Sequence, residues 1–117
     1  MNADEMKTRT KRFAIEVAKL TEKLPQTLIN KIYSGQIIRS SSSVGANYRA
    51  SRRAKSTADF INKLKIVEEE LDESLFFLEL LVEFNTPFQE TVERLYIEGE
   101  QLLRIIVSSI VTTRKNR

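Results

Sequence analysis

The apolar residues between positions 60 and 110 recur at helical spacing in two consecutive runs. The steps are 4, 3, 4, 7 and 3 in the first run, with Ser74 in the skipped place, and 4, 3, 4, 3, 4 and 4 in the second. Steps of three and four place side chains on one face of an α-helix. The sequence therefore predicts two long helices with one buried stripe each. The stripes are Phe60, Leu64, Val67, Leu71, Leu78 and Leu81, and then Phe88, Val92, Leu95, Gly99, Leu102, Ile106 and Ile110.

Capping signals set the expected limits of these two helices. Ser56 followed by Asp59 resembles a capping box with Asp in place of Glu, and Asn85 is expected to end that helix after about residue 84. Thr86 is expected to cap the next helix, with Pro87 at its first position and Gln89 completing the box. That helix should continue to about residue 112.

The N-terminal half adds a clear helix and an ambiguous segment. Phe13, Val17, Leu20 and Leu24 step by 4, 3 and 4, which predicts a helix over about residues 5–23 that Pro25 ends. Residues 27–39 also have helical spacing, but the SSSSVGAN stretch at residues 40–47 has the composition of a loop.

A helical projection at about 100° per residue favours one continuous helix from residue 27 to about residue 53. The apolar and small residues keep one face across the serines, and the basic residues keep the opposite face, an order that a loop has no reason to maintain. The first face carries Ile29, Tyr33, Ile37, Ser40, Val44 and Tyr48, and the second carries Lys31, Arg39, Arg49 and Arg53. With no extended alternation typical of strands, the predicted class is all-α in a single domain, residues 1–117.

Two residue types that the chain lacks limit the active sites and metal sites that it can form. The chain has no cysteine and no histidine, so it can form neither disulfides, nor thiolate or imidazole metal sites, nor a Ser-His or Cys-His nucleophile. We predict a protein that is not an enzyme and has no metal or cofactor. It shows no signal-peptide h-region and no apolar run of about 18 residues, so we expect a cytoplasmic protein without membrane contact.

Basic and acidic residues are segregated along the chain. Between Glu22 and Asp59 there are seven basic residues and no acidic one. Several cations on one helix face neutralise phosphates and release counterions, so this face is the candidate nucleic-acid site. The alternatives are a solvated helix face or ion pairs with the acidic third helix. The candidate residues are Lys31, Arg39, Arg49 and Arg53, joined at the following turn by Arg52 and Lys55.

The third helix carries two further signals. Its acidic cluster, residues 68–73, lacks the Glu-x-x-His pairs of carboxylate di-metal bundles, so we expect it to form ion pairs with the basic second helix of the same or a neighbouring subunit. Its C-terminal part is apolar on nearly every side, which predicts burial by a second subunit or, alternatively, a fully internal helix end. The expected oligomer interface is Leu75, Phe76, Phe77 and Leu80. Gly99 is expected to allow close helix contact, against the small-residue face of the second helix, unless it is a tolerated defect.

The central stretch also resembles a known family. Gln-Ile-x-Arg-Ser-Ser at residues 36–41, Ser-Val-x-Ala-Asn at 43–47, the basic turn, Phe60 and the Glu-rich helix ending Leu-Glu-Leu-Leu are similar to the bacterial 23S rRNA intervening-sequence proteins. The lead-in from Phe13 to Leu24 fits too, so the resemblance covers most of the chain. One departure is that Asn47 is followed by Tyr48, Arg49 and Ala50, where many relatives carry an acidic residue and glycine. The basic replacement favours an anionic partner.

The resemblance implies an antiparallel up-and-down four-helix bundle that assembles as a ring-like homopentamer. One branch of the family is encoded inside intervening sequences of rRNA genes. Another serves as the accessory protein of diversity-generating retroelements and binds nucleic acid and a reverse transcriptase through a basic surface. The implied partners are therefore RNA or DNA, and a reverse transcriptase or other protein. The rival interpretation is a protein scaffold whose basic face docks an acidic partner.

Overall fold

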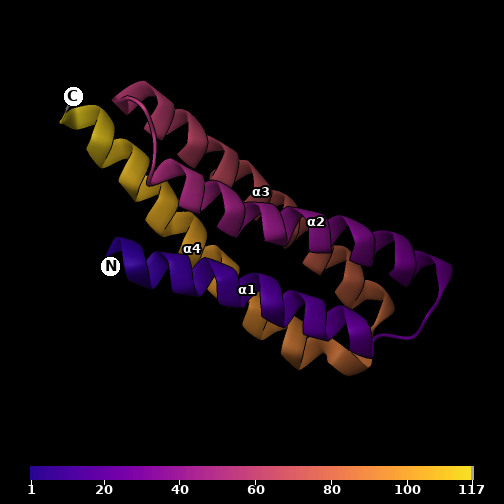
Figure 1. Cartoon of the computed structure of the whole chain (residues 1–117). Coiled ribbons are helices and arrows are strands. Elements are labelled where there is room, and N and C mark those ends of the chain that lie inside the picture. Colours follow the sequence, from indigo (N-terminus) through magenta and orange to yellow (C-terminus); the bar gives the residue numbers. More distant parts are fainter. Residues whose placement is uncertain (117) are drawn as a thin grey trace.

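The computed structural model describes residues 1–116, which form four α-helices joined by short connections. They are α1 (Ala3–Lys23), α2 (Leu28–Ser51), α3 (Thr57–Phe84) and α4 (Gln89–Lys115), with a 3₁₀ turn, η1 (Thr86–Phe88), before α4. Each helix packs against the next in the chain, and α4 returns beside α1, so the bundle is antiparallel and up-and-down (Figure 1). It measures 48 × 21 × 20 Å. The predicted fold class is confirmed.

The start of α3 confirms the predicted cap but only half of the box. The Ser56 side chain accepts the Asp59 backbone N–H at 3.1 Å, as expected for an N-cap. The Asp59 carboxylate does not return to the Ser56 backbone, however. It accepts the backbone N–H of Lys55 at 3.0 Å and the ammonium of Lys63 at 2.6 Å. The turn between α2 and α3 is therefore closed by one carboxylate with two donors.

The predicted cap at Thr86 is wrong. Residues 86–88 form a 3₁₀ turn in which the Phe88 N–H donates to the Asn85 carbonyl at 2.9 Å, and α4 begins only at Gln89, without a side-chain cap. The Gln89 side chain donates to Glu93 at 2.9 Å instead of completing a box. A tight i→i+3 turn satisfies the connection here, so no hydroxyl cap is needed.

The serine-rich segment is helical, as predicted. Ser40 and Ser41 direct their hydroxyls back to the carbonyls of their own helix, and both are fully buried inside α2. The Ser40 hydroxyl also lies 2.9 Å from the Ser74 hydroxyl of α3. On the other side, an added Cβ at Gly45 would meet the Thr10 backbone at 3.6 Å. Small side chains on α2 therefore let both neighbouring helices approach closely.

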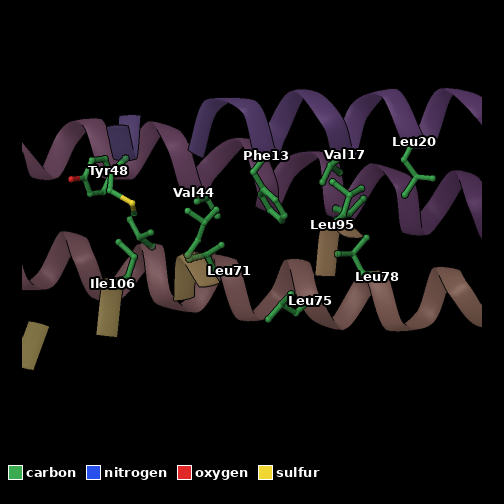
Figure 2. Packing of buried hydrophobic residues seen from close by; sticks show 14 of the residues in the cluster. Phe13, Val17, Leu20, Val44, Tyr48, Leu71, Leu75, Leu78, Leu95 and Ile106 are labelled. Carbon is green, nitrogen blue, oxygen red and sulfur yellow. The ribbon is translucent and has the colours of Figure 1, made fainter. Parts of the chain in front are cut away.

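Phe13, Val44 and Leu71 come from three different helices and point into the shared interior (Figure 2). The predicted stripes of α3 and α4 are buried, except that Phe60 and Phe88 at their first positions are only half-buried. Leu75, expected at an oligomer interface, lies in the core with 5% exposure.

The expected partner of Gly99 is wrong. An added Cβ at Gly99 would lie 2.8 Å from a Leu75 methyl of α3 and 3.4 Å from the Phe13 ring of α1, whereas the prediction placed α2 there. Diagonal helices of a four-helix bundle do not touch, and α4 is diagonal to α2. Gly99 therefore makes room for Leu75, which explains why that side chain turns inward.

Candidate nucleic-acid interface

Parts of all four helices meet at one end of the bundle. The start of α1, the connection between α2 and α3 and the end of α4 lie together, on the side where both chain termini are seen (Figure 1). We call residues 1–7, 48–66 and 109–116 the basic end. It holds nine basic residues against Asp4, Glu5 and Asp59. The nine are Lys7, Arg49, Arg52, Arg53, Lys55, Lys63, Lys65, Arg114 and Lys115.

The opposite half of the bundle has the reverse balance. Residues 14–41 and 73–102 hold five basic and nine acidic residues. The separation of charge follows from the antiparallel topology. The starts of α1 and α3, the ends of α2 and α4 and the connection between α2 and α3 lie at one end of the bundle, and these segments are rich in basic residues. The molecule is thus electrostatically bipolar along its long axis, and the positive pole is where a polyanion would be attracted.

Four of the six predicted phosphate-binding residues lie at this pole. Arg49, Arg52, Arg53 and Lys55 are all exposed, and none of them forms an ion pair with a carboxylate in residues 1–116. Lys31 shares their helix face but lies 18 residues before Arg49, about 27 Å away at 1.5 Å per residue. It therefore belongs to the opposite end and not to the same local surface.

Arg39 already forms ion pairs within its own chain. Its guanidinium donates to Glu70 at 3.0 Å and also pairs with Glu73, both on α3 of the same chain. The expected ion pairing between the basic second helix and the acidic cluster is therefore observed, within one subunit. Because Arg39 remains half exposed, this pair contributes only about 0–1 kcal/mol to stability. It nevertheless removes Arg39 from the candidate interface.

Sequence reasoning did not place the neighbouring bases of α1 and α4 in this site. Lys7 and Lys11 of α1 line a shallow groove of about 270 Å³ together with Arg49 of α2, over a floor that includes Gly45 and Ala46. Arg114 and Lys115 occupy the last turn of α4 at the same end. The positive charge of both chain ends was visible in the sequence, but only the pairing of the helices shows that it joins the α2 cluster.

Arg52 lies next to two aromatic side chains. Its guanidinium carbon lies 5.7 Å from the centroid of the Phe60 ring, within the range of a cation–π contact. It also lies beside the buried Tyr48. Burial raises the pKa of the Tyr48 phenol, and the Arg52 guanidinium opposes this rise through its charge and a hydrogen bond.

A depression of about 410 Å³ opens next to this arginine. Arg52, Lys55 and Phe60 line it together with the hydroxyl-bearing Ser56, Thr57 and Thr113. Among the residues from 1 to 116, no acidic side chain lines it. Asp59, which follows Thr57 closely in the sequence, is bound to Lys63 and to the Lys55 backbone, which together hold its pKa below the usual value.

An apolar patch covers the outer face of α2 and α3 in the opposite half of the bundle. Two tilted ring contacts, each with 6.1 Å between centroids, join Tyr33 to Phe77 and to Phe84. Phe76 and Phe84 are more than half exposed, at 53% and 55%. We call the following set the α2–α3 patch: Leu28, Ile29, Ile32, Tyr33, Phe76, Phe77, Leu80 and Phe84.

The patch includes three of the four residues expected at an oligomer interface, since Leu75 faces the core instead. Ring contacts join Tyr33, Phe76, Phe77 and Phe84 into one aromatic cluster. Exposed apolar clusters of this kind are often interaction surfaces. The sequence could not reveal its α2 part, because Ile29 and Tyr33 were expected on the buried stripe.

The remaining residues suggest neither a metal centre nor a membrane span. Within residues 1–116 no three acidic side chains converge in a way that could hold a metal ion. In the same part of the chain no helix combines the length and apolar character needed to cross a bilayer.

Comparison with known proteins assigns the chain to a family. The sequence model described as 23S rRNA-intervening sequence protein matches residues 4–108. The chain belongs to this family. A solved structure from Bacteroides thetaiotaomicron, described as a protein of unknown function from the S23 ribosomal protein family, is 33% identical. The match covers 94% of this chain and 98% of that chain, with a TM-score of 0.85. No match was found among proteins with curated descriptions.

In this chain, the residues that carry the family resemblance are largely packing residues. Ser40, Ser41 and Val44 are fully buried, and the Asn47 side chain bonds the Ser43 carbonyl and hydroxyl one turn earlier. They set the close approach of α2 to its neighbours. Arg49, by contrast, is exposed two residues beyond Asn47 and belongs to the basic end.

Proposed function

We propose that this protein is a non-enzymatic, self-assembling helical bundle of the cytoplasm that binds the phosphate backbone of RNA or DNA with its basic end. The observation that carries the proposal is the convergence of nine basic residues from all four helices and the α2–α3 connection on one end of the bundle. Family membership supports the same direction, because the resemblance implies a nucleic-acid partner.

The kind of contact follows from the residues present. Lysine and arginine contact phosphates and position a protein on nucleic acid, whereas base edges carry the sequence information. Tyr48 is buried and Phe60 lies under Arg52, so among residues 1–116 no exposed aromatic side chain near these cations is free to stack on bases. Binding should therefore depend weakly on sequence. Each phosphate neutralised should contribute about −0.9 to the slope of log K against log salt on duplex DNA.

Self-assembly is the second part of the proposal. We expect the α2–α3 patch of one copy to contact another copy of this chain. Stable interfaces bury about 800 Å² per partner, so the α2–α3 patch with its rim supplies much of one half. The exposed acids Asp72 and Glu83 lie on α3 near the aromatic residues of the patch in sequence. Their like charges disfavour the pairing of two identical patches, so we expect the patch to meet a different surface of the next copy. Repeated head-to-tail contacts close into a ring where the rotation between copies allows it, consistent with the homopentamer that the resemblance implies.

The test compares two charge reversals of equal size on opposite ends of the bundle. Arg49→Glu/Arg53→Glu should abolish the gel shift of a 40-nucleotide RNA or DNA at low salt, because it removes two cations from the basic end and adds two anions. The matched control, Lys23→Glu/Lys31→Glu, changes the net charge equally in the opposite half and should leave most of the affinity. All four residues are exposed, so both variants should fold.

Three outcomes separate the alternatives. Wild-type protein that gives no shift at low salt would refute nucleic-acid binding and favour the scaffold whose basic surface docks an acidic protein, such as a reverse transcriptase subunit. Equal losses in both double variants would show attraction by net charge alone, without a local interface. Retention of affinity by the Arg49/Arg53 variant would exclude these two arginines as main contacts.

A further inference from the structure

The depression beside Arg52 contains a cation that contacts an aromatic ring and forms no ion pair with a carboxylate in residues 1–116. Most exposed lysines and arginines pay side-chain entropy for each phosphate they bind. Arg52 is already held over the Phe60 ring at 5.7 Å and beside Tyr48. A guanidinium that is fixed in this way keeps its remaining N–H donors in a planar fork, the geometry that matches phosphate oxygens.

The lining of the depression complements this fork. Lys55 supplies a second cation, and the Ser56 oxygen accepts the Asp59 N–H, so its own hydroxyl proton is free to donate. Thr57 presents a further hydroxyl without an intramolecular hydrogen bond in residues 1–116. Asp59, which could repel an anion, is engaged by Lys63 and by the Lys55 backbone. A volume of about 410 Å³ exceeds what a phosphate group needs.

We infer that this depression is a discrete phosphate-binding pocket, in which Arg52 makes a positioned, forked contact while the other basic residues act only as diffuse charge. The inference deepens the proposed function, since it assigns one phosphate of the bound nucleic acid to a particular site. It also separates Arg52 from Arg53, its neighbour in sequence with the same charge and no ring beneath it.

Charge-conserving substitutions test the geometry without changing the electrostatics. Arg52→Lys should weaken oligonucleotide binding by about tenfold or more, because a charge-assisted hydrogen-bond pair is lost while the charge remains. Arg53→Lys, the matched control, should change affinity by less than about twofold. Phe60→Leu keeps an apolar side chain in the half-buried site but removes the ring, so it should reproduce part of the Arg52→Lys loss. Combined with Arg52→Lys, it should add little.

A second measurement uses inorganic phosphate as the probe. Titrating phosphate into ¹⁵N-labelled protein at constant ionic strength, with chloride as the reference anion, should shift the amide signals of residues 52–57 in wild type and in Arg53→Lys, and much less in Arg52→Lys. Shifts spread equally over all cationic segments, or equal effects of the two lysine substitutions, would refute the pocket while leaving the proposed function intact. If oligonucleotides fail to bind but phosphate still shifts residues 52–57, the proposed function fails and the pocket stands.

Discussion

A buried amide pair ties the two loops of the acidic half together, and its removal gives a sharp test of the fold. Asn30 at the start of α2 and Asn85 at the end of α3 exchange hydrogen bonds of 2.9 and 2.7 Å. Each amide also donates to a backbone carbonyl, Asn30 to Pro25 at 2.9 Å and Asn85 to Leu81 at 2.8 Å. Both side chains are nearly inaccessible, with 4% and 3% exposure. Every polar atom of the pair is therefore satisfied only by the other partner and by local backbone.

The expected magnitudes follow from which atoms lose a partner. Asn30→Leu removes three hydrogen bonds and leaves the Asn85 carbonyl oxygen buried without a donor, which should cost about 3 kcal/mol. Asn85→Leu should cost about the same for the mirror reason. The double variant leaves no orphaned amide, so it should cost about as much as either single change, which implies a coupling energy of about 2–3 kcal/mol. Each single change should lower Tm by about 10 °C.

Urea unfolding followed by circular dichroism measures these free energies. All variants should be compared at one protein concentration, because self-assembly makes apparent stability depend on concentration. Additive single effects, with the double variant near 6 kcal/mol, would show that the two amides do not act as a pair. A single change that costs less than about 1 kcal/mol would show that water replaces the missing partner and that the site is not closed.

Three further outcomes can be measured on the same preparations. Gly99→Ala should leave the free energy of unfolding within about 1 kcal/mol of wild type, because gained helix propensity offsets the contact with the movable Leu75 methyl, whereas Gly99→Val should cost about 1–3 kcal/mol in thermal unfolding. Lys63 and the Lys55 backbone lower the pKa of Asp59 from its usual value of 3.8. The carboxylate therefore stabilises the fold above pH 3.8, and this contribution is lost as the pH falls through the lowered pKa. Asp59→Asn should reduce the loss of stability at acidic pH in pH-dependent unfolding. Phe76→Glu should reduce the mass seen by light scattering toward the 13.5 kDa monomer, and an unchanged mass would exclude the α2–α3 patch as the interface.

The helices could be predicted because each one needs only its own periodicity. Val67, Leu71 and Leu78 are buried as their spacing required, and the serines of α2 kept the phase of one face. The connection at Thr86 was not predictable in the same way. A hydroxyl followed by proline permits a capped helix or a 3₁₀ turn, and the choice depends on how α4 must approach α3, which is a tertiary constraint.

The site was predicted only in part for a related reason. A helical wheel reports the direction of a side chain around its own axis and ignores height along the bundle, so Lys31 and Arg49 appeared together although about 27 Å separates them. It also ignores what the neighbouring helix offers, which is why Arg39 was counted as free although two glutamates bind it. Likewise Leu75 joined the exposed aromatics in the prediction because nothing in its own helix reveals that Gly99 opens a space for it.

The positions of the α2–α3 patch and the basic end relate the two proposed properties. Phe76 lies 16 residues beyond Phe60 on α3, or about 24 Å along the axis, so a contact made by the patch of one copy does not itself cover the basic end of that copy. Copies related by rotation about one axis parallel to the bundles would place these ends at the same height, forming a repeated positive surface. A polyanion that spans two or more ends then binds more tightly than one that reaches a single end, because the second contact is intramolecular. A single surface cation contributes little to binding a phosphate. Tight binding is still expected, because an assembled protein presents several basic ends to the same polyanion.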